Sequence, residues 1–381
     1  MLQSLEIKNY RSLKDLKINS LGRINLITGK NNTGKSTLLE AISLYASKCD
    51  LAWINQLLDE RGENYRSTQN TANPIDVNIK AFSSLFSNRN VNFFANDSIS
   101  IGIMEDTLFG SQTSTERSVS IRFVKYVDEL IYASEGPDRL LNRRKRTIIQ
   151  EEDLENVIDF HVGLEIRDGV ISYILPLEEE RSLRYNNYRS ITPPDNFQLI
   201  RTRNIDRDIN GKLWDSITLT EKESYVIDAL RIIEPDIDRL AYVEESTRER
   251  TTVVRLKNDN HVLPLRCMGD GINRVLTIIL ALVNCDSGFL LIDEFENGLH
   301  YSVQEQLWKI VFKLSKMLNV QVFATTHSED CIRGFESVLN DNQNIVDGKL
   351  IRLDNVNGKI KQTEFTAGEL KTAADNDIET R

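Results

Sequence analysis

Gly29 to Ser36 read GKNNTGKS and complete the pattern G-x-x-x-x-G-K-[ST]. Glycines at these positions let the backbone wrap closely around phosphate oxygens, so that consecutive N–H groups point at the anion. A strand-like segment, residues 23–28, precedes the loop, and a helical apolar spacing over residues 35–45 follows it. The sequence therefore predicts a strand, a phosphate-binding loop and the amino end of a helix.

The loop also supplies side chains that suit a nucleoside triphosphate. We expect Lys35 to neutralise the β- and γ-phosphates of ATP, and the hydroxyl of Ser36 to bind Mg²⁺. A glycine turn without a ligand is the alternative, which the flanking strand and helix disfavour. The predicted nucleotide-binding residues of this loop are Gly29, Asn31, Asn32, Thr33, Gly34, Lys35, Ser36 and Thr37.

A second apolar segment far along the chain, residues 289–292, ends in Asp293 and Glu294. A continuous apolar run is typical of a parallel strand that is buried on both faces. We expect Asp293 to bind Mg²⁺, directly or through water, because this ion keeps several waters and needs few protein carboxylates. Glu294 is predicted to be catalytic and to polarise the attacking water. An exposed acidic strand end is the alternative.

A third apolar segment, residues 320–324, leads through two threonines to His327. At the end of a core strand beside the phosphate strand, a histidine can reach the γ-phosphate and report its presence. We therefore predict a catalytic, phosphate-sensing role for His327, with a purely structural histidine as the alternative.

Residues 268–274 read MGDGINR and open an apolar helix. Two glycines ahead of a helix make a second amino end that can bind an anion. A single ATP does not need two such sites, so we expect this one to contact the nucleotide of a partner subunit, with two ATP molecules between two chains. A glycine turn that only starts a buried helix is the alternative. The predicted contacts are Gly269, Asp270, Gly271 and Asn273.

Composition limits the remaining classes of function. A formal net charge of −10 disfavours a broad duplex-DNA surface. The four cysteines show no metal-ligand spacing, which favours reduced thiols in a cytosolic protein. Strand-like alternation begins within the first residues, where a signal segment would lie, and the longest apolar stretch is about half of a membrane span. We expect a soluble, cytoplasmic protein without membrane contact.

The middle of the chain predicts antiparallel strands, because residues 99–104, 119–127 and 162–175 alternate apolar and polar side chains. Asp168-Gly169 is a hairpin turn signal. The heavily charged residues 139–156 predict a projecting helix, and residues 220–233 predict another. Residues 51–60 are expected to form a further helix, with loop beyond it up to residue 98.

Two basic stretches, residues 143–146 and 181–203, leave nucleic-acid binding open. The second stretch contains Tyr185 and Tyr188, and arginines beside stacking aromatic rings can hold nucleic acid. In an acidic protein a solvated face or a protein contact is the alternative.

Taken together, the segments NYRSLKDL, GKNNTGKST, MGDGINR, LLIDEFENGLH and ATTHSED resemble the ATP-binding-cassette heads of the RecF, SMC and OLD-like group. Within that branch they are most similar to stand-alone bacterial AAA-type ATPases. The resemblance covers residues 1–45 and 238–335 and implies an α/β P-loop fold. It implies a mixed parallel core sheet, an antiparallel β subdomain and a helical insertion.

The resemblance also assigns motifs along the chain. It implies a Walker A motif at 29–36, a signature loop at 268–274, a Walker B motif at Asp293 and Glu294, a D-loop at 296–300 and a switch histidine at 327. Arg11 and Ser12 resemble the family's pair near the nucleotide. Gly269 stands where the family has a serine, which puts ATP-driven dimerisation in question, and Gln198 is a candidate for the Q-loop glutamine.

The domain organisation follows from the same motifs. We expect a single discontinuous head over residues 1–381, with a nucleotide-binding core at 1–48 and 238–362. Residues 49–237 would hold the antiparallel strands and helical insertions at about 130–160 and 205–235, and residues 363–381 a loose tail. Relatives often carry a C-terminal Toprim nuclease, but Asp375 and Asp377 lie in a short polar segment. Any nuclease would then be a separate polypeptide.

The sequence thus favours an Mg²⁺-dependent ATPase that forms a nucleotide-sandwich homodimer and controls a separate effector in bacterial defence against phage. A RecF- or SMC-like ATP-dependent DNA-binding protein is the main alternative. A small-molecule kinase would leave residues 268–274 without a role, and a transporter ATPase would need a membrane partner chain.

Overall fold

The computed structural model describes residues 1–63, 73–94, 97–104, 118–134, 140–157, 159–178, 193–202, 207–244, 250–257, 261–341, 347–366, 368–370 and 372. The chain forms two compact units, the first from residues 1–4, 18–39 and 195–381 and the second from residues 5–17 and 40–194. The structure thereby groups residues 195–237 with the nucleotide motifs, whereas the sequence predicted them in the middle region.

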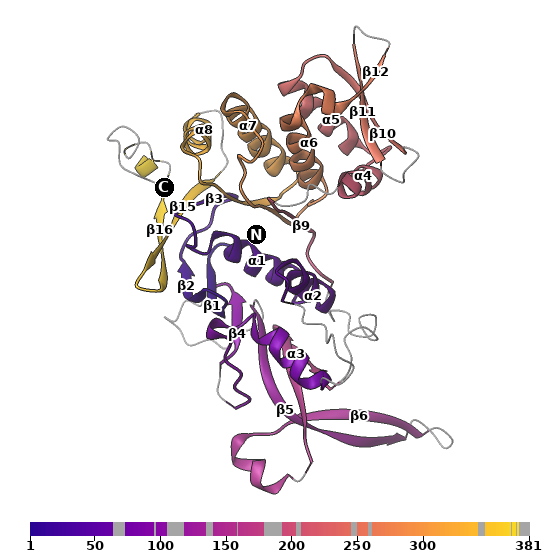
Figure 1. The fold of residues 1–381 in the computed structure, drawn as a ribbon, viewed down its shortest axis with the longest axis vertical. Helices are drawn as coiled ribbons and strands as arrows, with labels where there is room; N and C mark the ends of the chain where they lie inside the picture. The colour runs from indigo at the N-terminus through magenta and orange to yellow at the C-terminus, as the bar shows by residue number, and fades with distance from the viewer. Residues whose placement is uncertain are drawn as a thin grey trace. The chain divides into compact units, whose positions relative to one another are not determined.

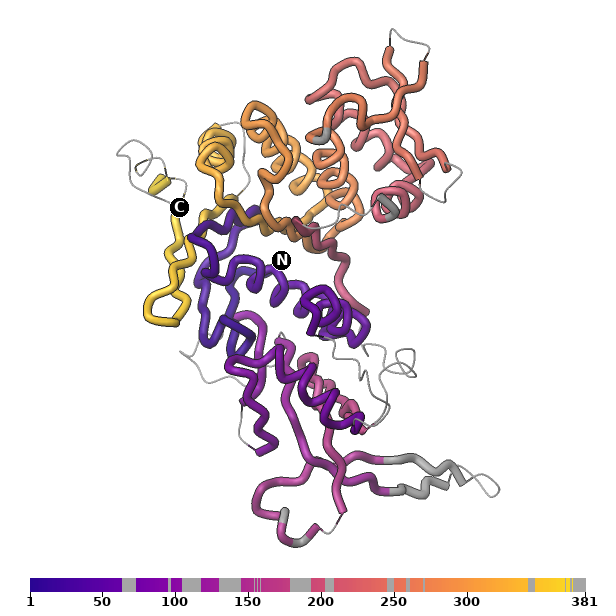
Figure 2. The backbone as a smooth tube through the Cα atoms, viewed as in Figure 1, coloured from indigo at the N-terminus to yellow at the C-terminus, as the bar shows by residue number. Residues whose placement is uncertain are grey.

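The first unit contains a six-stranded sheet in the order β16-β15-β3-β14-β13-β9. All neighbours run parallel except the edge pair β15 and β16, which is antiparallel. Figure 2 shows the start of the chain in indigo beside its end in yellow, where β3 pairs with β15. The strands are β3 (Ile24–Thr28), β9 (Phe197–Ile200), β13 (Phe289–Ile292), β14 (Gln321–Thr325), β15 (Gly348–Val356) and β16 (Lys359–Phe365).

Three strands in the middle of this sheet explain why the nucleotide motifs meet. Every residue of β3, β13 and β14 is buried, as expected of parallel strands covered on both faces. The carboxyl ends of these strands lie at one edge of the sheet, where ligands bind in open α/β sheets. Each of the predicted motifs at Gly29, Asp293 and His327 follows one of these strands.

Helices pack against the sheet through one apolar core. Helices α6, α7 and α8 lie side by side (Figure 1), and the stacked rings of Phe295 and Trp308, with centroids 3.9 Å apart, lie in this core. A smaller antiparallel sheet of three strands precedes α6. These elements are α4 (Arg207–Asp215), α5 (Glu221–Ile233), β10 (Ile237–Glu244), β11 (Arg250–Leu256), β12 (Val262–Pro264), the 3₁₀ turn η6 (Leu265–Met268), α6 (Asp270–Val283), α7 (Tyr301–Met317) and α8 (Glu329–Asn340).

The second unit is built on a seven-stranded sheet in the order β2-β1-β4-β5-β7-β8, with β6 paired to β5. The predicted turn at Asp168-Gly169 is confirmed, since β7 and β8 pair antiparallel around it and Gly169 has a φ of 58°. Its elements are β1 (Leu5–Tyr10), β2 (Leu13–Ile18), α2 (Leu51–Glu60), α3 (Pro74–Ser83), η1 (Ser87–Arg89), β4 (Ile99–Gly102), β5 (Ser118–Ser134), β6 (Leu140–Ile148), η4 (Glu151–Asn156), β7 (His161–Asp168) and β8 (Ile171–Pro176). Helix α1 (Lys35–Ala46) begins in the first unit and ends in the second.

The helix predicted over residues 139–156 is wrong. Residues 140–148 form strand β6, which pairs with the C-terminal half of β5 (Figure 1), and a 3₁₀ turn follows. Arg146 faces Asp128 across the two strands, and their side chains form an ion pair at 3.4 Å. Opposite charges on directly opposed residues stabilise a strand pair, so the charge pattern that suggested a helix supports a hairpin.

Strand β16 and helix α3 also differ from what the sequence predicted. Strand β16 continues through Phe365, so the predicted loose tail begins inside a strand. Helix α3 lies in a stretch that was expected to be loop. Within the described part of the chain, no helix combines the length and apolar character needed to cross a membrane.

Candidate functional site

The phosphate loop joins β3 to α1 through a backbone that requires glycine. Gly29 and Gly34 have φ angles of 135° and 89°, in the region that side chains disfavour. A Cβ atom on Gly29 would lie 2.3 Å from the carbonyl oxygen of Leu353 on β15. Asn32 is also left-handed, with a φ of 63°, and the hydroxyl of Thr33 donates to the carbonyl of Lys30 at 2.9 Å. The tight loop leaves its N–H groups at the amino end of α1.

Lys35 is held inside this loop. Its ammonium group donates to the carbonyl oxygens of Gly29 and Lys30, at 2.7 and 2.9 Å, and the residue is only 6% exposed. Burial lowers the pKa of Lys35 from 10.5 to about 8, against the opposing effect of Asp293, Glu294 and Glu296. Lys35 is therefore a cation near three carboxylates.

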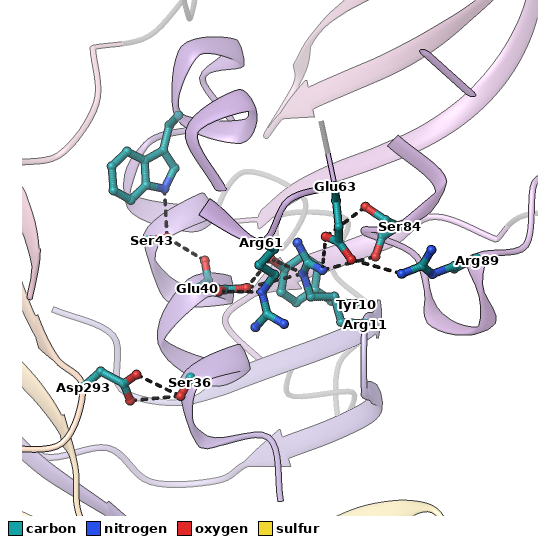
Figure 3. A network of polar contacts seen from close by, with 11 residues as sticks. Tyr10, Arg11, Ser36, Glu40, Ser43, Arg61, Glu63, Ser84, Arg89 and Asp293 are labelled. Carbon is teal, nitrogen blue, oxygen red and sulfur yellow. Dashed lines mark hydrogen bonds and ion pairs between the residues drawn. The ribbon is translucent and has the colours of Figure 1, made fainter. Parts of the chain in front are cut away.

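Ser36 and Asp293 are brought into direct contact. The Ser36 hydroxyl oxygen lies 3.0 and 2.9 Å from the two carboxylate oxygens of Asp293, and Figure 3 shows the side chains facing each other. A hydroxyl and a carboxylate are hard oxygen donors that suit Mg²⁺ when water and phosphate complete its shell. In the described ranges, no group of three His, Cys, Asp or Glu side chains forms a larger metal site.

Glu294 adopts an uncommon backbone conformation, with a φ of 51°. Residues other than glycine rarely occupy the left-handed region, and strain of this kind clusters at functional sites. The backbone of Glu294 is held by two other residues. Its N–H donates to the hydroxyl of Thr325 at 2.9 Å, and its carbonyl accepts from the guanidinium of Arg274 at 3.0 Å.

Arg274 was not predicted as a site residue. It is only 1% exposed, and its guanidinium also donates to the carbonyl of Asp293 at 3.0 Å. Burial lowers the pKa of Arg274, while Asp293, Glu296 and Glu294 act in the opposite direction. The signal in the sequence was an arginine that opens an otherwise apolar helix directly after the glycine loop.

The segment before His327 is tied to the predicted D-loop. The backbone N–H of His327 donates to the side chain of Glu296 at 2.8 Å. Thr325 is the last residue of β14, so His327 follows the strand that lies between β3 and β13. The structure thus places His327 at the sheet edge that carries the other nucleotide motifs.

The glycine loop before α6 is open at its first glycine and close-packed at its second. Gly269 has a φ of 101°, and a Cβ atom there would have no atom within 4 Å. A Cβ atom on Gly271 would lie 3.1 Å from the carbonyl oxygen of Gly298, so the signature loop and the D-loop touch within one chain. The carbonyl of Asn273 accepts from the hydroxyl of Thr277, and the side chain of Asp270 lies outside the described parts. Contact with a partner nucleotide remains a prediction.

Arg11 belongs to a buried ion cluster in the second unit (Figure 3). Its guanidinium lies 2.6 Å from Glu63 and 3.4 Å from Glu40, and its side chain is 7% exposed. Arg61 forms a second ion pair with Glu40 at 2.9 Å. Because Glu40 lies on α1, this cluster holds the helix that begins with Lys35. Ser12 is exposed, and a nucleotide contact by Arg11 and Ser12 stays a prediction.

The candidate Q-loop glutamine and one arginine of the basic stretches lie in strands. Gln198 lies on β9 and pairs with Leu290 of β13, next to the strand that carries Asp293. Arg146 is engaged with Asp128 and with the carbonyl of Ile174 at 2.7 Å. Of the two basic stretches that would carry nucleic acid, the side chains of 143 and 144, residues 181–192 and residue 203 lie outside the described residues, as do Asp375 and Asp377.

Comparisons with known proteins agree with these motifs. The family described as "AAA domain, putative AbiEii toxin, Type IV TA system" matches residues 24–330. An "ATP/GTP phosphatase" of Helicobacter pylori is 23% identical over 361 residues, which cover 90% of this chain and 89% of that protein. A "DNA double-strand break repair Rad50 ATPase" of Archaeoglobus fulgidus is 55% identical over 42 residues, which cover 11% of this chain and 5% of that protein.

The matches among solved structures include heads of SMC proteins. The crystal structure of an SMC head bound to the C-winged helix domain of ScpA has a TM-score of 0.48 and 13% identity, and the match covers 96% of this chain and 98% of that one. The SMC head domain from Thermotoga maritima has a TM-score of 0.42 and 11% identity, with coverage of 96% and 98%. The family match, in contrast, spans the phosphate loop, the Asp293–Glu294 pair and His327. The chain therefore belongs to the AAA-domain family of that description, and it is an ATPase.

Proposed function

We propose that this protein is an Mg²⁺-dependent molecular switch that binds and hydrolyses ATP, closes into a homodimer around two nucleotides and controls a separate effector. The observation that carries this proposal is the contact of the Ser36 hydroxyl with the Asp293 carboxylate, at 2.9 and 3.0 Å. This contact joins the phosphate loop to the acidic strand end. The charge of Lys35 lies beside the same carboxylates.

Binding of ATP would use the loop backbone and Lys35. The N–H groups of residues 29–37 would donate to the phosphate oxygens at the amino end of α1, and the Lys35 ammonium would exchange its two carbonyl contacts for phosphate oxygens. Ser36 and Asp293 would hold Mg²⁺, which when bound neutralises phosphate charge. The loop provides the fixed positive environment that a triphosphate requires.

Hydrolysis would use Glu294 and His327. Glu294 would orient a water and accept its proton as the water oxygen attacks the γ-phosphorus. The bond between the γ-phosphorus and the bridging oxygen then breaks and leaves ADP and phosphate. His327 would contact the γ-phosphate, and the Glu296 side chain that accepts from the His327 backbone would fix the sensor segment.

Dimer formation would use residues 269–273 of each chain on the nucleotide of the other. Gly269 replaces the family's serine, and its φ of 101° would strain a serine at this position. The partner contact would therefore come from backbone N–H groups and from Asn273. Light scattering of Glu294→Gln should show dimers with ATP and monomers without it, and a mass that ATP leaves unchanged would argue against the sandwich.

The effector role rests on the family alone. The family description names a putative toxin and a type IV toxin–antitoxin system, which supports a role in bacterial defence. We place that role in the cytoplasm. Cells that carry the native operon should survive phage challenge, and Glu294→Gln should abolish that protection. Equal survival of the two strains would contradict the defence role.

The substitution Glu294→Gln tests the catalytic role that we assign to Glu294. The substitution removes the carboxylate that orients water, so kcat should fall by about 100-fold or more while ATP affinity stays near that of the wild type. Lys35→Ala should weaken ATP binding itself. Unchanged hydrolysis by Glu294→Gln would reject the assignment.

A DNA-binding role is the second candidate, favoured by the local match to the Rad50 ATPase. Retention of duplex DNA that requires ATP and is lost at high salt would support it, because phosphate contacts release counterions. No retention at low salt with ATP would favour the effector switch.

A further inference from the structure

Thr325 joins the two acidic residues of the site through one hydroxyl group. The Thr325 hydroxyl donates to a carboxylate oxygen of Asp293 at 2.8 Å, and the Thr325 hydroxyl oxygen accepts from the backbone N–H of Glu294 at 2.9 Å. The carbonyl oxygen of Thr325 accepts from the N–H of Phe295 at 2.9 Å. Three consecutive residues of the acidic segment are therefore bound to one residue of β14.

The sheet register explains why Thr325 reaches this segment. Strands β13 and β14 are parallel, and Ile292 pairs with Ala324. Asp293 follows the last residue of β13, and Thr325 is the last residue of β14 and still pairs with Ile27 of β3, so both lie at the carboxyl edge of the sheet. Thr325 is fully buried, whereas Asp293 and Glu294 are partly exposed.

Only a hydroxyl can make both side-chain contacts at once. It has one hydrogen to donate to the carboxylate and two lone pairs, one of which accepts the N–H group. Valine has nearly the same shape but can do neither, and serine keeps both functions. Loss of the hydroxyl would leave the buried N–H of Glu294 without its partner.

The backbone of Glu294 needs such support because its φ is 51°. A left-handed backbone persists when surrounding contacts hold it. Thr325 binds the N–H of Glu294, and Arg274 binds its carbonyl. The direction of the Glu294 side chain follows from this backbone conformation.

We propose that Thr325 is a positioning residue for ATP hydrolysis: its hydroxyl orients the Asp293 carboxylate toward Ser36 and holds Glu294 in the conformation that presents its carboxylate to the attacking water. The inference rests on the proposed roles of Asp293 and Glu294. It adds a residue that touches neither nucleotide nor metal and acts through the two carboxylates.

The test compares Thr325→Ser with Thr325→Ala, because both lack the γ-methyl group and differ only in the hydroxyl. Thr325→Ala should lower kcat by about 10- to 100-fold, since small misplacement of a catalytic group can cost about 100-fold. Its affinity for ATP without Mg²⁺ should stay close to that of the wild type, and its half-maximal Mg²⁺ concentration should rise. Thr325→Ser should restore most of kcat and the Mg²⁺ response.

Thr326→Val is the matched control. Thr326 is the next residue, it is equally buried, and its hydroxyl accepts from the N–H of Ser328 at 3.0 Å. Thr326→Val should therefore keep kcat and the Mg²⁺ response of the wild type. If Thr326→Val lowers kcat as much as Thr325→Ala does, removal of any buried hydroxyl at this strand end lowers kcat. That result would overturn the inference.

Glu294→Gln separates this inference from the proposed function. If Glu294→Gln is inactive while the serine and alanine variants at 325 have equal kcat and Mg²⁺ dependence, the role of Thr325 is wrong and the site assignment stands. If Glu294→Gln hydrolyses ATP normally, the site assignment itself fails. Melting temperatures of both variants, measured without nucleotide, show whether each is folded at the assay temperature.

Discussion

Ser36 and Asp293 are in hydrogen-bond contact although 257 positions separate them along the chain. The contact follows from the strand order of the sheet, in which β14 lies between β3 and β13. Since all three strands are parallel, the residues that follow them meet at one edge. The order of the strands thus brings the hydroxyl group and the carboxylate together.

Gly29→Ala should both destabilise the protein and weaken ATP binding. The position has a φ of 135°, and a methyl group there would meet the carbonyl oxygen of Leu353 at 2.3 Å. A left-handed backbone alone costs an L-residue about 1–2 kcal/mol, and the overlap adds to this. Urea unfolding should therefore show a loss of at least about 2 kcal/mol. Gly368→Ala, which has open space around it, should change the stability little; equal losses in the two variants would refute the argument.

The affinity for ATP should fall as pH rises through about 8. Lys35 has a pKa of about 8 in the free protein, below its usual 10.5, because burial disfavours the charged form. Below pH 8 the ammonium is present and attracts phosphate, and above pH 8 it loses its proton. Binding at pH 9 should therefore take up a proton, which calorimetry in two buffers of different ionisation enthalpy measures.

Lys35→Arg is the control for this pH dependence, because arginine keeps its charge at every pH of the experiment. Its affinity, whatever its absolute level, should stay constant between pH 7 and pH 9. Constant affinity in the wild type over the same range, without proton uptake, would contradict the lowered pKa of Lys35.

Glu40→Ala should destabilise the protein strongly. The carboxylate of Glu40 is 3% exposed and pairs with Arg11 and Arg61. Removal of Glu40 takes away the carboxylate that Arg11 and Arg61 share and leaves the buried Arg11 with Glu63, so the loss should approach that of a broken buried ion pair, about 3–5 kcal/mol. Glu6→Ala is the comparison, because Glu6 pairs with two half-exposed lysines and should contribute about 0–1 kcal/mol. Equal losses in denaturant unfolding would show that burial of the cluster does not matter.

The sequence predicted the nucleotide core best where chemistry demands a fixed local pattern. The loop of residues 29–36 and the apolar strand of residues 289–292 lie where they were expected, because phosphate binding requires glycine and a buried parallel strand requires a continuous apolar run. Helix α2, predicted over residues 51–60, has the same bounds in the structure, with Asp50 as its N-cap.

Local sequence patterns do not predict elements that form only by pairing with residues far along the chain. Strand β9 has only four residues, and it is a strand because β13 pairs with it from a remote part of the chain. Strand β6 was mistaken for a helix because a charged stretch can also be a hairpin strand, in which the charge of Arg146 is compensated by Asp128 on the neighbouring strand and not along a helix face. Helix α3 does carry a local signal, an Asn73 N-cap followed by a proline, which the polar composition around it obscured.

The sequence also did not predict the residues that support the backbone of the site. Arg274 and Thr325 flank Glu294, and their contacts depend on how α6 and β14 pack against β13. Spacing along the chain does not report such contacts. Arg11, which the motif suggested for the nucleotide, lies in the ion cluster with Glu40 and Glu63.

The central claim is that Lys35, Ser36 and Asp293 serve one triphosphate. A crystal structure with Mg²⁺ and a nonhydrolysable ATP analogue tests it most directly. We predict the Lys35 ammonium within hydrogen-bond distance, about 3 Å, of the β- and γ-phosphates, and the Ser36 hydroxyl about 2.1 Å from Mg²⁺ with Asp293 beside it. A triphosphate bound elsewhere, or these side chains more than about 10 Å apart around it, would contradict the account.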